Sequence, residues 1–130
     1  MKKITILLVI IFTFLFTNTS WGEWSYVEED VYNGNKFYYD KDRVRKNGKY
    51  LYFWKLVDYY ISNKWGNLSE TSYIQLDCSI FRYKNLKNYF YKNYMGKGGF
   101  TDFTPKDEWD YPKPNSVMEY MCNFVCEEHQ

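Results

Sequence analysis

The sequence predicts an α+β fold, in which an antiparallel β-sheet of about five or six strands carries a C-terminal α-helix packed on one face. Aromatic residues suit the pleated surface of a sheet, and the 130-residue chain has 15 Tyr, 10 Phe and 5 Trp. Runs rich in these residues are separated by short turn sequences, which is typical of antiparallel strands. The last segment instead has the apolar periodicity of an amphipathic helix. Strands followed by a helix indicate the α+β class.

Residues 1–22 read as a secretory signal peptide. Two lysines precede a short apolar stretch from Ile4 to Phe16, and small and polar residues follow it. The stretch is shorter than the roughly 20 residues that span a bilayer, so an uncleaved anchor is the less favoured alternative. We place cleavage after Gly22, with cleavage after Ser20 as a close alternative. Residues 23–130 then form one domain with a single core, and no membrane span is expected after cleavage.

The charge balance gives no reason to expect nucleic acid or an anionic membrane as a partner. The chain has 17 Lys and Arg against 16 Asp and Glu, a net charge of +1. Cleavage of the signal peptide removes two lysines and no acidic residue, which leaves a net charge of about −1. Binding to a phosphate backbone needs a clear excess of basic residues, which this composition lacks.

The first part of the domain predicts a β-hairpin followed by a short helical turn. Residues 24–28 alternate as in a strand, residues 36–40 read as a second strand, and an Asn-Gly-Asn turn lies between them. Asp40 is then placed to cap a helical turn over residues 41–44.

Two long strands are predicted for the middle of the domain. The first covers residues 49–61 and has aromatic or apolar residues on both faces, as expected of a central strand. The second covers residues 69–83. One of its faces carries Ile74, Leu76, Cys78 and Ile80. By the period-two rule Cys78 therefore projects toward the core, whereas Asp77 faces away and is expected to bond a neighbouring strand or loop.

The segment that follows predicts one more strand and a loop. A bulged strand covers residues 86–95, and a glycine-rich stretch ends it. Residues 100–114 read mostly as loop, with Trp109 as their anchor. Trp24, Trp54 and Trp109 are interpreted as core anchors rather than as platforms for a ligand.

The C-terminal segment predicts an amphipathic helix. Ser116 and Glu119 form a capping-box pattern, in which each side chain accepts an amide proton from the start of the helix. An apolar stripe follows at helical spacing and consists of Val117, Tyr120, Met121, Phe124 and Val125. Such a stripe needs an apolar surface, so the helix is expected to lie across one face of the sheet.

Three cysteines, Cys78, Cys122 and Cys126, remain after the signal peptide is removed. An exported chain reaches an oxidising compartment, so this count favours one disulfide and one odd thiol. Cys122 lies closer to the apolar stripe of the helix, whereas Cys126 points away from it unless the last turn frays. These residues alone leave both pairings with Cys78 open. A zinc site fits poorly because the C-x-x-C spacing is missing, and no metal or cofactor is expected.

Several short motifs follow one another along most of the domain. They are Trp24, FYYD ending at Asp40, YFWKLVDYY around Trp54 and Asp58, QLDCS around Asp77 and Cys78, YMGKGG, EWDYPKPNSV and a terminal cysteine. In this order and spacing they resemble the surface-adhesin protein E family of small exported bacterial domains. The resemblance implies a disulfide that tethers the C-terminal helix to the sheet. The ten-residue step from Ser116 to Cys126 matches the family pattern, which implies the pair Cys78–Cys126 and leaves Cys122 as an extra thiol.

No combination of residues indicates catalysis. His129 is the only histidine and lies one residue from the chain end, so a nucleophile would lack its usual base. The acidic groups at 28–30 and 107–110 read as solvated loop charge. The GKGGF sequence lacks the spacing of a phosphate-binding loop and is interpreted as a turn.

Exposed tyrosines on the sheet face opposite the helix form the candidate binding site. They are Tyr50, Tyr52, Tyr60 and Tyr73. Tyrosine gives a broad contact area at little entropic cost, so such a cluster suits a protein or sugar ligand. The alternative is that a loop, or a second protomer in a homodimer, covers this face.

The sequence therefore predicts an exported, non-catalytic binding domain in the periplasm, at the cell surface or released from it. The family resemblance implies an adhesin-like protein with a host matrix or envelope protein as its partner. A first alternative is a small periplasmic ligand carrier, for example of haem, although few histidines or methionines are placed to ligate iron. A second is a small secreted hydrolase, and a third is an inhibitor or immunity protein that blocks an enzyme.

Overall fold

The computed structural model describes residues 23–130, so the expected signal peptide lies outside the described residues. It confirms the α+β class: one antiparallel sheet of seven strands and one C-terminal helix, α2. The sheet runs β1-β2-β4-β5-β6-β7, and β3 pairs with β4. The elements are β1 (Ser25–Glu29), β2 (Lys36–Tyr39), β3 (Arg45–Asn47), β4 (Tyr50–Asp58), β5 (Ser69–Asp77), β6 (Arg82–Tyr91), β7 (Phe100–Phe103) and α2 (Val117–His129), with short 3-10 turns η1 (Lys41–Arg43) and η2 (Tyr94–Gly96). Among the described residues, none of the helices has the length and apolar character needed to cross a membrane.

The predicted N-terminal hairpin and the turn after it are confirmed. β1 pairs with β2, and the Asp40 side chain caps η1 by accepting the amide proton of Asp42 at 3.2 Å. β2 pairs with the second half of β4, and β3 pairs with its first half. The β2-η1-β3 segment therefore runs along β4 as a single strand interrupted by the η1 turn.

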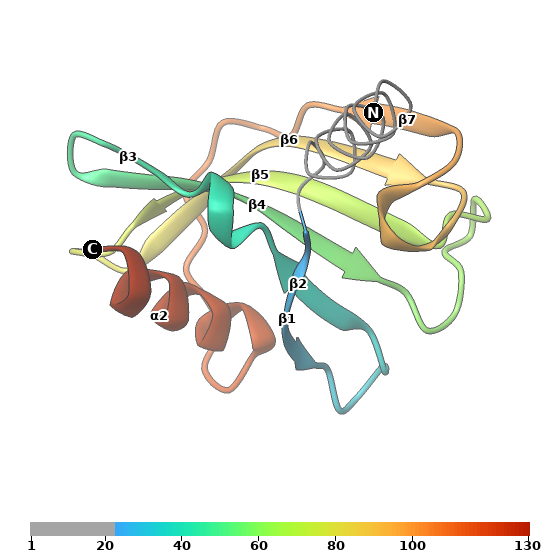
Figure 1. Ribbon diagram of the computed structural model, residues 1–130, viewed down its shortest axis with the longest axis horizontal. Coiled ribbons are helices and arrows are strands. Elements are labelled where there is room, and N and C mark those ends of the chain that lie inside the picture. Colours follow the sequence, from blue (N-terminus) through green and yellow to red (C-terminus); the bar gives the residue numbers. More distant parts are fainter. Residues whose placement is uncertain (1–22) are drawn as a thin grey trace, which may run out of the picture.

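The helix α2 covers one face of the sheet and buries the core there. In Figure 1 it lies along one side of the sheet, and its C-terminal end is at the end of the molecule where β3 and β4 meet. The core combines side chains of β2, β4 and β5 with one stripe of α2. Its buried members are Tyr39, Leu51, Phe53, Ile74, Leu76, Met121, Cys122 and Val125.

The apolar stripe of α2 is turned relative to the one predicted. Met121 and Val125 are buried as expected, but Tyr120 is 49% exposed. Cys122 is fully buried instead, and Met118 packs against the same core. These residues fall at helical spacing with Cys126, so the face of α2 that carries the disulfide is also the face that meets the sheet.

The disulfide joins Cys78 to Cys126, with 5.9 Å between their Cα atoms, and leaves Cys122 as a free, buried thiol. The pairing implied by the family resemblance is thus confirmed. The predicted strand over residues 69–83 is wrong, however, because β5 ends at Asp77 and β6 begins at Arg82. Cys78 lies in the turn between them, so it reaches the helix from the end of the sheet rather than from its face.

The outer part of the sheet contains the predicted bulged strand, which covers Arg82–Tyr91 rather than residues 86–95, and one strand that was not predicted. The pairing of β5 with β6 shifts register so that Ile74 faces Asn85 while Tyr73 faces Lys87, which leaves Leu86 as the extra residue. β7 lies in the segment predicted as loop and pairs with the second half of β6. Its four residues are all exposed, so it lacks the half-buried alternation by which strands are recognised.

The start of α2 gives the first testable prediction. Ser116 Oγ accepts the amide proton of Glu119 at 3.1 Å. The Glu119 carboxylate accepts the amide proton of Asn115, whereas the capping-box pattern predicted the amide proton of Ser116. We expect Ser116→Ala to lower the free energy of unfolding by about 1 kcal/mol, because an amide at the helix start loses its acceptor. Urea unfolding measures the loss, and Ser116→Thr, which keeps a hydroxyl, is the matched control. Equal losses in both variants would contradict the capping role.

Candidate binding face

The sheet face opposite α2 is covered by aromatic side chains, and we call it the aromatic face. Alternation along β4 places Tyr50, Tyr52 and Trp54 on this face, and strand pairing places the other members beside them. From β5, β6, β7 and the loop after β7 it gains Tyr73, Tyr89, Tyr91, Phe100 and Trp109. Phe100 is exposed and the other rings are half-buried, so part of this aromatic surface is accessible to solvent.

Contacts between rings connect the aromatic face from β4 to β7. Tyr52 stacks on Tyr73 with 6.1 Å between ring centroids, and Trp54 lies 4.9 Å from the same ring. Trp54 also lies 6.1 Å from Tyr89, which contacts Phe100 edge-on at 5.6 Å. The rings of the aromatic face therefore pack against one another as a continuous group.

Trp109 anchors the loop after β7, as predicted. Its ring lies 5.6 Å from that of Tyr50, and the Arg82 guanidinium lies over the Trp109 ring, 4.1 Å from its centroid. Backbone hydrogen bonds between Tyr83 and Asp110 hold the same loop against β6. Trp109 therefore forms one end of the aromatic face and is not part of the helix-side core.

The prediction that Trp24, Trp54 and Trp109 anchor the core is wrong. Trp109 lies at one end of the aromatic face, and the half-buried side chains of Trp24 and Trp54 line a cavity on that face. The sequence did contain the relevant pattern, because Trp54 has the same strand parity as Tyr50 and Tyr52.

Ion pairs border the aromatic face on the side of β6. Lys84 Nζ lies 2.7 Å from Asp107, and Lys87 Nζ lies 2.8 Å from Asp102. The hydrogen bond from Lys87 lowers the pKa of Asp102, and that bond raises the pKa of Lys87, so both groups stay charged at neutral pH. Apolar rings inside a border of paired charges resemble the core and rim of a protein interface.

The structure brings together three of the four predicted tyrosines. Tyr50, Tyr52 and Tyr73 lie on the aromatic face, but Tyr60 lies beyond the end of β4 and is 73% exposed. The Tyr60 amide donates to Asn35 Oδ1 at 3.0 Å, which places this residue at the β1–β2 turn instead. Sequence reasoning also missed Tyr89 and Tyr91, although their period-two spacing places both on one strand face.

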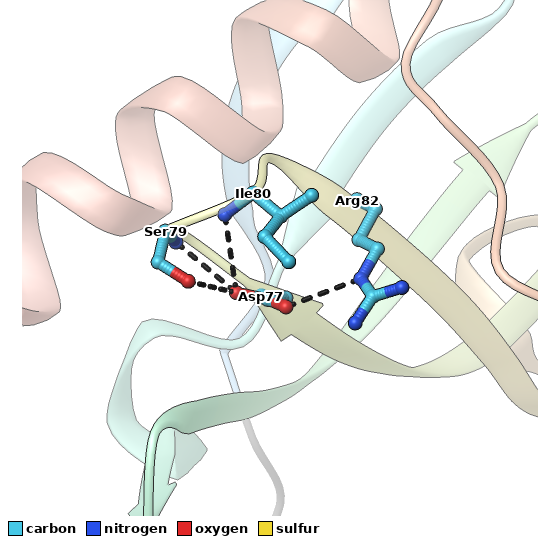
Figure 2. Close-up of polar contacts among 4 residues, drawn as sticks. All are labelled: Asp77, Ser79, Ile80 and Arg82. Carbon is cyan, nitrogen blue, oxygen red and sulfur yellow. Dashed lines mark hydrogen bonds and ion pairs between the residues drawn. The ribbon is translucent and has the colours of Figure 1, made fainter.

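Asp77 is a fully buried carboxylate that shapes the turn between β5 and β6 (Figure 2). Its Oδ1 accepts protons from the Ser79 hydroxyl at 2.7 Å and from the amides of Ser79 and Ile80, while Oδ2 accepts from Arg82 Nε at 3.1 Å. Burial alone would raise the pKa of Asp77, but these hydrogen bonds outweigh it and lower the pKa. The expected bond to a loop is thus confirmed, and a carboxylate so fully engaged holds the turn in place.

His129 and Cys122 are also engaged in contacts within the fold. His129 Nε2 lies 3.2 Å from the Tyr39 hydroxyl at the end of α2. Burial raises the pKa of the Cys122 thiol to about 12, so it remains protonated. No three His, Cys, Asp or Glu side chains among the described residues are grouped to hold a metal ion.

The fold defines a class of protein: a small antiparallel sheet domain with a C-terminal helix tethered by a disulfide. A family model described as surface-adhesin protein E matches residues 24–127, and the chain belongs to this family. The family is described as a surface adhesin, which agrees with the prediction of a non-catalytic binding domain.

Solved structures of Haemophilus influenzae protein E share the fold. One is 18% identical in sequence, with a TM-score of 0.58, and the match covers 81% of this chain and 86% of that one. A second crystal form is 19% identical, with a TM-score of 0.60 and coverage of 81% and 89%. At this identity the likeness concerns the fold alone. Among curated proteins, none matches this chain at a significant level.

Proposed function

We propose that this chain is an exported adhesin-like protein that binds a protein partner, from the host matrix or the bacterial envelope, through its aromatic face. The observation that carries this proposal is the continuous row of ring contacts from Tyr52 through Tyr73 and Trp54 to Tyr89. Tyrosine and tryptophan are enriched among the residues that dominate binding energy at protein interfaces. The family's description as a surface adhesin supports the same role.

Two features support export. The first is the basic and apolar character of residues 1–22, which is typical of a signal peptide. The second is the Cys78–Cys126 disulfide, since such bonds persist in oxidising compartments and are rare in the cytosol. We propose that the mature domain acts in the periplasm, at the cell surface or after release. Intact mass of the processed protein, measured with and without reductant, locates the cleavage site and counts the bridges.

Capture of partners on immobilised protein tests the aromatic face. We expect Tyr52→Ala/Tyr73→Ala to bind its partner at least about tenfold more weakly, since truncating a tyrosine that dominates an interface costs about 1–2 kcal/mol or more. The partner is captured from extracts of host matrix and bacterial envelope, identified, and titrated against each purified variant.

One single variant serves as the control, and a second tests another predicted tyrosine. Tyr120→Ala removes an exposed tyrosine from α2, on the other side of the sheet, and is expected to leave affinity unchanged. Tyr60→Ala tests separately the predicted tyrosine that lies at the β1–β2 turn. Unchanged affinity in the double variant, or an equal loss in Tyr120→Ala, would rule out the aromatic face as the binding surface.

A further inference from the structure

One end of the aromatic face is hollowed into a cavity of about 630 Å³. Trp54, Thr71, Tyr89 and Tyr91 form its floor on β4, β5 and β6. Residues 95–97 form one wall, and the other is formed by Trp24 and Arg43. The volume lies within the range of roughly 300–1,000 Å³ that small-molecule sites occupy.

Hydrogen bonds fix the wall formed by residues 95–97 to the sheet. The Met95 amide donates to Asp58 Oδ1 at 2.7 Å, and the Gly96 amide donates to Ser69 Oγ at 2.9 Å. The buried Ser69 hydroxyl in turn donates to the carbonyl of Asn93 at 2.6 Å. Since both acceptors belong to sheet strands, the wall stands in place without a ligand.

Gly96 allows this wall to lie directly on the sheet. Its φ of +67° favours glycine, and an added Cβ would come within 3.3 Å of Leu56 and 3.4 Å of Thr71. A larger residue would be strained at this φ and would crowd the side chains of Leu56 and Thr71. The glycine-rich stretch, interpreted from the sequence only as a turn, thus closes one side of a preformed site.

The lining combines aromatic rings with positive charge. Four of the nine lining residues are aromatic, and Arg43 and Lys97 are basic, whereas no Asp or Glu lines the cavity. Asp40, which is fully buried, accepts the Nε proton of Arg43 at 2.7 Å and so holds its guanidinium, while half of that side chain stays exposed. Lys97 is exposed at the opposite wall.

We propose that this cavity binds an acidic saccharide, whose ring lies on Trp54 and Tyr89 and whose carboxylate or sulfate contacts Arg43 and Lys97. The face of an aromatic ring is electron-rich and attracts the weakly positive C–H bonds on one side of a sugar ring. An anionic substituent matches the two cations and the absence of acids in the lining. An aliphatic ligand would make no polar contact with Lys97 or with the exposed part of the Arg43 guanidinium, and a neutral sugar would use only the rings. This site lies at one end of the aromatic face, shares Trp54 and Tyr89 with it, and is a function beyond the proposed protein binding.

Binding of three tetrasaccharides tests the proposal. They are a sulfated uronic-acid tetrasaccharide of the heparin type, an unsulfated one of the hyaluronan type and the neutral cellotetraose, each titrated by calorimetry and by tryptophan fluorescence into the exported, purified protein. Because Trp24 and Trp54 line the cavity, a bound sugar is expected to change their emission. We expect at least one acidic tetrasaccharide to bind at least about tenfold more tightly than the neutral one, since a charge-assisted contact contributes about a factor of ten. Binding of both acidic probes would mean that a carboxylate suffices, and binding of the sulfated one alone would show that sulfate is needed.

Matched charge reversals locate the site. Lys97→Glu changes an exposed side chain, and we expect it to lower the affinity for the acidic tetrasaccharide about tenfold or more. Lys64→Glu makes the same change at an exposed position outside the cavity and is expected to leave affinity unchanged. The proposal is overturned if no acidic probe binds, if cellotetraose binds as tightly, or if both variants lose equal affinity through general attraction of a polyanion. Capture of the protein partner by Lys97→Glu is measured in parallel. A variant that loses the sugar and still captures the protein separates this site from the proposed protein-binding role of the aromatic face.

Discussion

Removal of the Cys78–Cys126 disulfide is expected to lower the free energy of unfolding by about 4 kcal/mol. The bridge closes a loop of 48 residues and so lowers the conformational entropy of the unfolded chain. Without the bridge the unfolded chain regains this entropy and becomes more favourable. Small domains are stable by only about 5–15 kcal/mol, so the change is a large fraction of the total. The effect also exceeds that of losing the Ser116 cap.

Urea unfolding of Cys78→Ser/Cys126→Ser against the wild type measures this loss. Both cysteines are replaced together so that neither is left to pair with Cys122. The control is Cys122→Ala, which removes the free thiol and keeps the bridge, and it is expected to cost less because only one small buried side chain is trimmed. A double variant that unfolds at the same urea concentration as the wild type would show that packing of α2 alone holds the helix to the sheet.

Local patterns of this fold could be predicted from the sequence, but the turn that carries Cys78 could not. Alternation along β4 and the Ser116 cap are local patterns, and the structure confirms both. The continuous strand predicted over residues 69–83 failed because one side chain overrides the pattern. Asp77 Oδ1 accepts the amide protons of Ser79 and Ile80, which bends the backbone into a turn within a run of good β-formers.

The aromatic face was predicted only in part, because a local irregularity of β6 again changes the pattern of alternation. Tyr50 and Tyr52 share one strand, so their common face follows from spacing alone. On β6, Tyr83 and Tyr89 have the same parity and would lie on one face of a regular strand. The bulge at Leu86 separates them: Tyr83 packs against the helix-side core, and Tyr89 joins the aromatic face. Contacts that depend on the exact register between strands could not be inferred from the spacing within each strand.

Replacement of Asp77 by alanine is expected to lower the free energy of unfolding by about 3 kcal/mol. The carboxylate is fully buried, and its loss leaves the Arg82 guanidinium, only 20% exposed, without its counter-ion. The amides of Ser79 and Ile80 lose their acceptor in the same step. Asp77→Asn is the matched variant: it keeps an oxygen for these amides and loses the charge, so it is expected to cost about half as much.

The pH dependence separates the charge of Asp77 from its shape. Its pKa in the folded protein lies below the ordinary value of 3.8, so the ionised form is favoured by folding. The stability that this adds is complete above the ordinary pKa and is lost as pH falls through the lower, folded value. We therefore expect the gap in unfolding free energy between wild type and Asp77→Asn to be full at about pH 7 and to shrink below about pH 3.8. A gap that stays constant with pH would mean that Asp77 acts through its hydrogen-bond geometry, with no contribution from its charge beside Arg82.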